Sequence, residues 1–238
     1  MKKCLMLYVF LGLSFLTAGD LEFDVIETSA GPLKLAVVGH GSVLFEFQEK
    51  VIHVDPFSRV ADYAELPKAD LILITHEHGD HLDTGAIDKI KKEDTKIILT
   101  QICFDRSGMG TVMKNGDEME VLGIPIQAVP AYNIMHKRDS GEPFHPKGNG
   151  NGYVLTFGDK RVYVAGDTEN TPEMKALSDI DVAFLPMNVP YTMTPEMVAD
   201  AAKAFKPSVL YPYHYGKTDT NLLVALLKDE KEINVRIR

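Results

Sequence analysis

The sequence has little cysteine and no tryptophan. Among its 238 residues only Cys4 and Cys103 are cysteines, and they are far apart. Two cysteines cannot build a disulfide framework, and without a closely spaced pair nothing indicates a redox motif or a zinc ribbon. Any metal site in this protein must therefore use histidine and carboxylate side chains.

Basic residues are also scarce. The sequence has 25 Lys and Arg against 34 Asp and Glu, a formal net charge of −9, and no segment concentrates positive charge. A protein that binds nucleic acid through its phosphates needs such a basic patch. We therefore expect a small-molecule substrate as the partner and no nucleic acid.

Internal repeats, low-complexity runs and linkers are absent as well. The composition is 45% hydrophobic and 25% charged, with 18 Gly and 13 Pro. These values are typical of an ordinary globular protein, and a single domain can reach this length. We predict one domain over residues 20–238.

The first 19 residues have the pattern of a secretory signal peptide. Lys2 and Lys3 precede a mostly apolar run over residues 4–16, which is too short to span a bilayer as a helix. Small residues then occupy positions 17–19, where a signal peptidase cleaves. We predict cleavage near Gly19 and an exported protein, periplasmic or secreted, with no stable membrane anchor; an uncleaved N-terminal anchor is the alternative. Removal of residues 1–19 leaves 23 basic against 34 acidic residues, a net charge of −11.

Short β-branched runs and turn residues predict a mixed α/β structure. The first strands expected, which look antiparallel, are residues 34–38, 43–47 and 51–54. Residues 71–74 form a continuous apolar run, which favours a strand buried on both faces. Asp83 and Thr84 can cap a helix that ends near residue 92, and a strand is expected over residues 96–100. This order predicts a βαβ unit with its helix outside a buried sheet.

The second half of the sequence predicts more strands and two well-marked helices. Helices are expected after Thr171 and Thr194, because each precedes a proline suited to the first helical position. The strands expected are residues 121–129, 152–157, 161–164, 182–185, 208–211 and 233–237, with a hairpin turn at Gly158-Asp159 and a helix over residues 221–228. Residues 132–151 form a long irregular stretch, and loops of that length are often functional.

The densest group of polar side chains follows the apolar strand directly. Residues 75–81 read T-H-E-H-G-D-H, with three imidazoles and a carboxylate within six residues. His76 and His78 are two apart and lie on the same side of an extended strand end, while the following glycine allows Asp80 and His81 to turn towards a second point. We predict two neighbouring metal positions. Imidazole and carboxylate ligands suit Zn²⁺, Mn²⁺ or Fe.

This string resembles the His-x-His-x-Asp-His signature of the metallo-β-lactamase superfamily. The similarity continues in order through residues 37–45, 55–56, 132–133, 145–148, 163–168 and 213–215. It covers roughly residues 34–216, and the H-P-K-G string in the middle of the sequence is similar to the branch that contains ascorbate-6-phosphate lactonase rather than to class B β-lactamases. The resemblance implies an α/β fold, a four-layer αββα sandwich of two mixed sheets with helices on the outer faces.

The resemblance also implies a set of metal ligands. These are His76, His78 and His145 for one ion, Asp80, His81 and His214 for a second, and Asp167 as a bridge between them. The implied cofactors are two divalent metal ions, zinc first, with manganese or iron as alternatives. Asp80 and Asp167 are the implied catalytic carboxylates, which fix a hydroxide between the ions, and Asp80 is suited to accept a proton.

Several side chains beside these ligands have open roles. His136 is an alternative to His145 as a ligand, but the H-P-K-G match favours His145. His40 and His53 are expected to support the site or pack in the core. The candidates for substrate contact, each with loop packing as its alternative, are Tyr132, Asn133, Lys147, Tyr191 and Tyr215.

The ligand set predicts a metal-dependent hydrolase that uses a metal-bound hydroxide on a small-molecule lactone, ester, amide or phosphodiester. Two alternatives from other branches remain. A mononuclear-iron oxidoreductase similar to the persulfide dioxygenases is disfavoured because seven ligands suit two ions, and a nuclease is disfavoured by the charge of −11.

Overall fold

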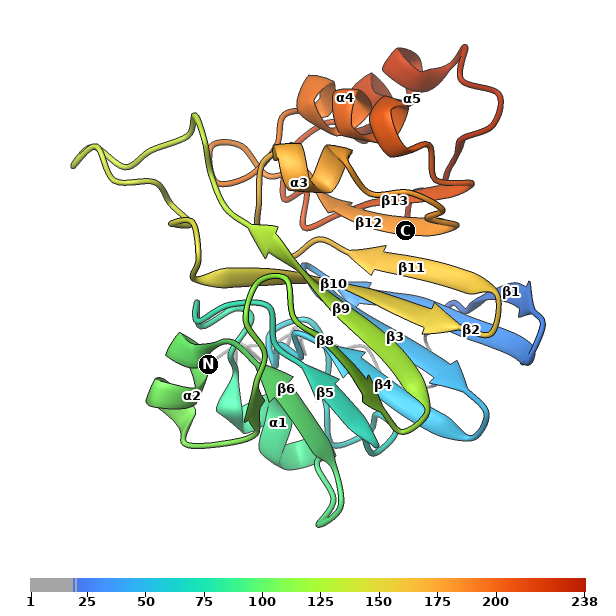
Figure 1. Cartoon of the computed structure of the whole chain (residues 1–238), viewed down its shortest axis with the longest axis vertical. Helices are drawn as coiled ribbons and strands as arrows, with labels where there is room; N and C mark the ends of the chain where they lie inside the picture. The colour runs from blue at the N-terminus through green and yellow to red at the C-terminus, as the bar shows by residue number, and fades with distance from the viewer. Residues whose placement is uncertain (1–18, 20) are drawn as a thin grey trace, which may run out of the picture.

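The structure, a computed structural model, describes residue 19 and residues 21–238 (Figure 1). The predicted signal peptide therefore lies outside the described residues, except for Gly19. Two seven-stranded β-sheets pack face to face, and helices cover both outer faces. This arrangement confirms the four-layer αββα architecture.

The first sheet follows the order of the sequence from one edge to the other. Its strands are β1 (Asp24–Thr28), β2 (Gly31–Gly39), β3 (Ser42–Phe47), β4 (Lys50–Val54), β5 (Leu71–Leu73), β6 (Lys96–Leu99) and β7 (Thr111–Val112). Strands β1 to β4 are antiparallel, and β4 to β7 are parallel. The antiparallel start and the parallel βαβ unit are confirmed.

The second sheet repeats this plan. Its strands are β8 (Glu118–Val121), β9 (Ile124–Ala131), β10 (Gly150–Phe157), β11 (Lys160–Val164), β12 (Val182–Pro186), β13 (Val209–Tyr213) and β14 (Asn234–Val235). Strands β8 to β11 are antiparallel, and β11 to β14 are parallel.

Five helices connect the strands in the described residues. They are α1 (Thr84–Ile90), α2 (Gln101–Ser107), α3 (Pro172–Lys175), α4 (Pro195–Phe205) and α5 (Thr220–Leu227). The predicted caps are confirmed, because the side chains of Asp83, Thr171 and Thr194 accept hydrogen bonds from the first turns of α1, α3 and α4. Of the helices in residues 19 and 21–238, none is both long enough and apolar enough to cross a membrane.

Three apolar layers hold the sandwich together. The central layer joins side chains of both sheets, for example Phe45 of β3 with Phe157 and Phe184 of the second sheet. A second layer lies beneath α3, α4 and α5, and a third lies beneath α1 and α2. The buried strands carry apolar side chains on both faces, because each sheet lies between the other sheet and a layer of helices.

Several elements differ from the sequence prediction, and strands β1 and β7 and most of β8 were not predicted. Residues 121–129 were expected as one strand, but β8 and β9 form a hairpin there. Leu122 and Gly123 both adopt positive φ angles, +56° and +78°, as a tight two-residue hairpin turn requires. Helix α2 was not predicted; it begins after Thr100, whose side chain accepts a hydrogen bond from the backbone N–H of Cys103.

Candidate metal centre

The polar cluster lies where parallel strands of both sheets end. In the first sheet Asp55 follows β4 and His76 follows β5; in the second sheet Asp167 follows β11 and His214 follows β13. The carboxyl ends of neighbouring parallel strands meet at one edge of a sheet, and this edge is the usual place for a site in α/β proteins. The two sheets therefore bring side chains from distant parts of the sequence to one point.

One group of imidazoles faces one side of Asp167. His76, His78 and His145 each offer one ring nitrogen, and these three nitrogens lie within 4.8 Å of one another. Nε2 of His76 lies 3.1 Å from Nδ1 of His78, and Nε2 of His145 lies 3.3 Å from Oδ2 of Asp167. All three residues predicted for the first ion are thus brought together with the predicted bridge.

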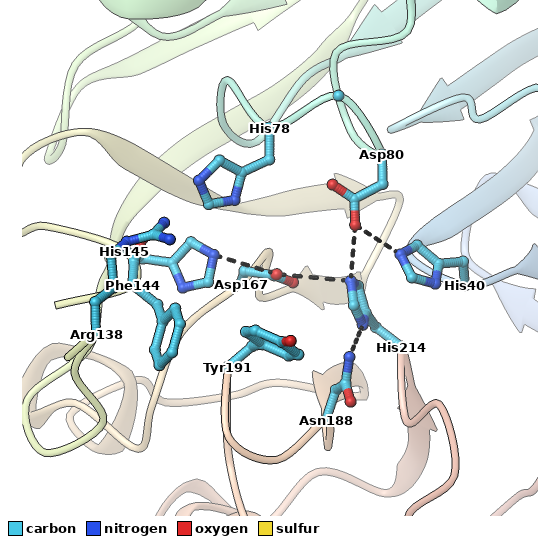
Figure 2. A pocket seen from close by; sticks show the side chains of 11 residues that line it. His40, His78, Asp80, Arg138, Phe144, His145, Asp167, Asn188, Tyr191 and His214 are labelled. Atoms are coloured by element: carbon cyan, nitrogen blue, oxygen red, sulfur yellow. Dashed lines mark hydrogen bonds and ion pairs between the residues drawn. The ribbon is translucent and has the colours of Figure 1, made fainter.

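A second group faces the other side of Asp167 (Figure 2). Ligand atoms of His40, Asp80, His81 and His214 lie within 4.8 Å of one another. Nε2 of His214 lies 3.6 Å from both Oδ2 of Asp80 and Oδ2 of Asp167, and Nε2 of His81 lies 3.6 Å from Oδ1 of Asp167. The residues predicted for the second ion are also together.

The donor set fits metal ions. The Nε2 atoms of His81, His145 and His214 and the Oδ1 atom of Asp167 are buried without a hydrogen-bond partner among the described residues. Buried polar atoms are nearly always partnered, and leaving several unpaired at one point is costly. Imidazole nitrogens and carboxylate oxygens that converge in this way are the ligands that zinc and similar divalent ions take.

Neighbouring side chains fix which nitrogen of His81 and of His145 faces the cluster. Nδ1 of His81 donates to Oδ2 of Asp55 at 2.8 Å, and Nδ1 of His145 donates to Oδ1 of Asn133 at 2.7 Å. With Nδ1 as the donor, Nε2 is the nitrogen that faces the cluster and can bind a metal. The side-chain amide of Asn188 lies 3.3 Å from Nδ1 of His214.

The electrostatics of the cluster favour a positive charge at its centre. Burial opposes the charge on Asp167, but the surrounding imidazoles, His214 and His81 foremost, hold the pKa of Asp167 well below its usual range. Burial likewise lowers the pKa of His81, but Asp167 and Asp55 outweigh it and raise that pKa to about 9. Burial, with the neighbouring imidazoles, keeps the pKa of His76 well below its usual value.

His40 supports the site and lines the pocket, which is the first of the two roles expected for it. Its Nε2 atom donates to Oδ2 of Asp80 at 2.8 Å, and its ring lies 3.8 Å from that of His214, centroid to centroid. His53 lies in the core instead, where it donates to the carbonyl of Pro67. His136 lies outside the cluster, with Nδ1 2.9 Å from Glu169, so His145 and not His136 meets Asp167.

The residues considered for substrate contact have different surroundings. Lys147 pairs with Glu173 at 2.7 Å, and the hydroxyl of Tyr132 donates to the same carboxylate. Tyr215 donates to the carbonyl of Arg238. Asn133 supports His145, as described above, and Tyr191 lines the pocket over the cluster.

The cluster opens into a pocket of about 510 Å³. Figure 2 shows Asp167 near its centre, with His78 and His145 on one side and Asp80, His40 and His214 on the other. Sequence reasoning missed three side chains of this region. Asn188 and Arg138 line the pocket, and Asp55 lies behind His81. Asp55 had a detectable signal, because it follows its strand as His76 follows the next one; the other two lie in loops without a recognisable pattern.

Comparisons with known proteins agree with this fold. The family model described as the beta-lactamase superfamily domain matches residues 34–214. A UPF0173 metal-dependent hydrolase from Pyrococcus abyssi is 34% identical over 199 residues, which cover 77% of this chain and 85% of that protein.

Solved structures show the same relationship. A candidate metal-dependent hydrolase from Parabacteroides distasonis is 50% identical, with a TM-score of 0.87 over 92% of this chain and 98% of that one. Igni18, a metallo hydrolase from Ignicoccus hospitalis, is 25% identical, with a TM-score of 0.72 over 87% of this chain and 94% of that one.

The αββα sandwich and the histidine–aspartate cluster at its strand ends define a metallo-β-lactamase-like protein. The family match and the curated relatives place it more narrowly: the chain belongs to the β-lactamase superfamily and, within it, to the UPF0173 family of metal-dependent hydrolases.

Proposed function

We propose that this metal-dependent hydrolase uses two divalent ions, zinc first, to cleave a small-molecule lactone, ester, amide or phosphodiester. In this proposal one ion is bound by His76, His78 and His145, and the other by Asp80, His81 and His214, with Asp167 between them. The observation that carries the proposal is the convergence of unpartnered buried imidazole nitrogens on both sides of one carboxylate.

When bound, a pair of such ions lowers the pKa of water to near 7 and withdraws charge from a substrate oxygen. Asp167 supplies the central carboxylate in this arrangement. It is 5% exposed, and the imidazoles around it favour its ionised form, so it keeps its charge at neutral pH. Its position fixes the two halves of the site relative to each other.

Asp80 has a different task, because it lies at the wall of the pocket. Its Oδ2 atom accepts a hydrogen bond from His40 and lies near His214, which holds the carboxylate in one orientation. We infer that Asp80 orients the attacking water and takes up its proton, to be passed to the departing group.

The pocket supports a small substrate. A volume of about 510 Å³ lies within the range of small-molecule sites. On the sequence patterns described above, we also propose that the protein is exported to the periplasm or the medium. Its proposed partner is a small-molecule, lactonase-like substrate.

Metal content tests the proposal first. The protein, purified without chelator, is analysed by plasma mass spectrometry and assayed on a panel of lactones, esters, amides and phosphodiesters, with an RNA oligonucleotide included. About two ions per molecule and hydrolysis of one small-molecule class would support it. One iron per molecule without hydrolysis would favour oxidative chemistry instead, and a metal-free protein would overturn the ligand assignment.

A substitution at Asp80 tests the mechanism. We expect Asp80→Ala to lower kcat by about 100-fold or more, because it removes the proposed proton acceptor. Asp88→Ala is the matched control, since Asp88 is an exposed aspartate on α1 that pairs only with Lys91 in the described residues. An Asp80→Ala protein with full activity would contradict the mechanism.

A further inference from the structure

One wall of the pocket carries a cation that the metal cluster does not use. Arg138 is the sole lysine or arginine among the described residues that line the pocket. Figure 2 shows it beside His145 and Phe144, on the opposite side of Asp167 from Asp80 and His40. A substrate that reaches from the cluster towards this wall therefore meets a positive charge.

The guanidinium of Arg138 is not neutralised by the protein. It donates to the carbonyl of Phe144 at 3.3 Å and lies 5.1 Å from the centre of that ring, and in residues 19 and 21–238 no carboxylate lies within 4.0 Å of it. Lys147, in the same loop, is different, because Glu173 already pairs with it. Arg138 therefore keeps both its charge and several N–H donors available.

The loop that carries Arg138 is held in place. The backbone N–H of Arg138 donates to the carbonyl of Glu142, and the carbonyl of Arg138 accepts a hydrogen bond from the backbone N–H of Gly141. Residues 138–142 therefore make a tight turn. At the base of the loop, the buried carboxylate of Glu169 accepts hydrogen bonds from the backbone N–H groups of Ile134 and Met135. The backbone of the turn that carries Arg138 is thus held in place, and its guanidinium contacts Phe144.

Two aromatic rings lie in the wall next to Arg138. Phe144 and Tyr191 meet edge to face, with ring centres 5.0 Å apart, and both line the pocket. The carbonyl of Tyr191 accepts a hydrogen bond from Asn133, the residue that also orients His145. An apolar surface therefore lines the pocket beside the metal ligands and the cation.

We propose that Arg138 determines substrate specificity by binding an anionic group, a carboxylate or a phosphate, of a compact substrate whose reacting bond lies at the metal cluster. The middle of the substrate packs against Phe144 and Tyr191. A planar guanidinium with paired N–H donors suits such oxoanions. The expected effect of Arg138 on turnover rests on the proposed hydrolase function. The expected binding of an anionic group by Arg138 does not.

A matched pair of lactones tests the charge recognition in the metal-loaded protein. 5-Oxotetrahydrofuran-2-carboxylate and its carboxamide have nearly the same shape and differ in charge. Hydrolysis adds water, breaks the ring C–O bond and releases a proton from the new acid, which a pH-stat measures. We expect Arg138→Met to lower kcat/KM for the carboxylate about 10- to 100-fold, and for the carboxamide less than about 3-fold.

Two further variants separate recognition from general charge. Arg138→Lys keeps the charge and should retain part of the preference for the carboxylate. Lys137→Met makes the same change in net charge on the neighbouring residue, which is exposed and does not line the pocket, and should leave the preference unchanged. Equal effects of Arg138→Met on both lactones, or an equal effect of Lys137→Met, would overturn the proposal.

Binding provides a test that does not need turnover. Calorimetric titration of the metal-loaded protein with 2-hydroxyglutarate, the ring-opened product, should give weaker binding to Arg138→Met than to the unmodified protein. If neither lactone is hydrolysed while binding still depends on Arg138, the proposed lactone substrate fails and the anion site stands. Binding independent of Arg138 would overturn the anion site. Titration with glutarate and with glycerol 3-phosphate shows whether the site that contains Arg138 binds a carboxylate or a phosphate group more tightly.

Discussion

At the scale of single residues, Asp55 supports the site most directly without facing the pocket. Its buried carboxylate accepts hydrogen bonds from the backbone and the hydroxyl of Thr75 and from Nδ1 of His81. Asparagine tolerates the φ angle of +46° at this position, but it lacks the charge that strengthens the hydrogen bond from His81 and raises the basicity of its imidazole. We expect Asp55→Asn to weaken metal binding about 10- to 100-fold, measured by competition with a chromophoric chelator.

The control for this substitution is Asp94→Asn. The side chain of Asp94 is 80% exposed, and the change in charge is the same. Metal affinity should stay at the level of the unmodified protein in this control. Equal affinities of Asp55→Asn and Asp94→Asn would show that Asp55 does not support a metal ligand.

His53 gives the protein a pH-dependent stability. It is 1% exposed in β4, and burial lowers its pKa to about 4 despite its hydrogen bond to Pro67. The folded state therefore favours the neutral imidazole. The contribution of His53 to stability is fully present above the unfolded pKa of about 6.5. As the pH falls from there towards 4, the free energy of unfolding decreases by about 3 kcal/mol.

Replacement by glutamine tests this contribution. His53→Gln keeps a polar side chain that can donate to Pro67 and removes the titration. Urea unfolding at pH 7 and at pH 4.5 should show a smaller loss of stability for His53→Gln than for the unmodified protein. Parallel pH profiles of the two proteins would refute the assignment to His53.

The sequence made the residues of the H-x-H-x-D-H string recognisable because their spacing is local. Asp167, His145 and His214 come from distant parts of the sequence and were expected mainly through the family resemblance, with the strand end before Asp167 as the one local signal. Asp55 and Arg138 were not predicted, for different reasons. The contact of Asp55 with His81 joins residues 26 positions apart, and Arg138 lies in a long irregular loop, where no spacing records which side chains line the pocket.

At the scale of elements, the turn between β2 and β3 touches the site through Gly41. A Cβ atom there would lie 2.7 Å from Cε1 of His81 and 3.4 Å from Cδ2 of His214. A gap of 2.7 Å is too short for carbon atoms, so Gly41→Ala must displace the turn or the imidazole. We expect loss of metal from the second position, seen as fewer ions per molecule, with little change in far-UV circular dichroism.

Gly79→Ala is the matched control, since a Cβ atom at Gly79 meets nothing within 4 Å. Gly79 lies within the motif itself, but the added methyl group should leave the metal content unchanged. If Gly41→Ala binds metal as the unmodified protein does, close packing of this turn on the ligands is not required.

Elements were predictable where one signal dominated. The apolar run before His76 and the Thr-Pro helix starts gave β5, α3 and α4. Helix α2 and strand β1 were missed because they are short and half-buried, so hydrophobic periodicity is weak. The strand predicted over residues 121–129 runs through the β8–β9 turn, because that turn contains Leu122, a residue that rarely adopts a positive φ angle.

At the scale of the whole molecule, Asp24 joins the two sheets and the C-terminal residue. It lies in β1 of the first sheet, accepts a hydrogen bond from the hydroxyl of Tyr211 in the second sheet, and pairs with Arg238 at 2.7 Å. Partial burial opposes its charge, but these partners outweigh that effect and lower its pKa. Its contribution to stability is therefore present above the unfolded pKa near 3.8 and lost as the pH falls through the lower folded value.

Asp24→Asn should lower the free energy of unfolding at pH 7 by about 2 kcal/mol, because it removes charge-assisted hydrogen bonds to two partners. Urea unfolding measures this loss, and Glu27→Gln, an exposed acid in the same strand, is the control for net charge. Metal content should not change in Asp24→Asn, because neither Tyr211 nor Arg238 is a residue of the metal cluster. A loss of metal together with stability would mean that the link between the sheets also positions the ligands, so that site and sandwich form one cooperative unit.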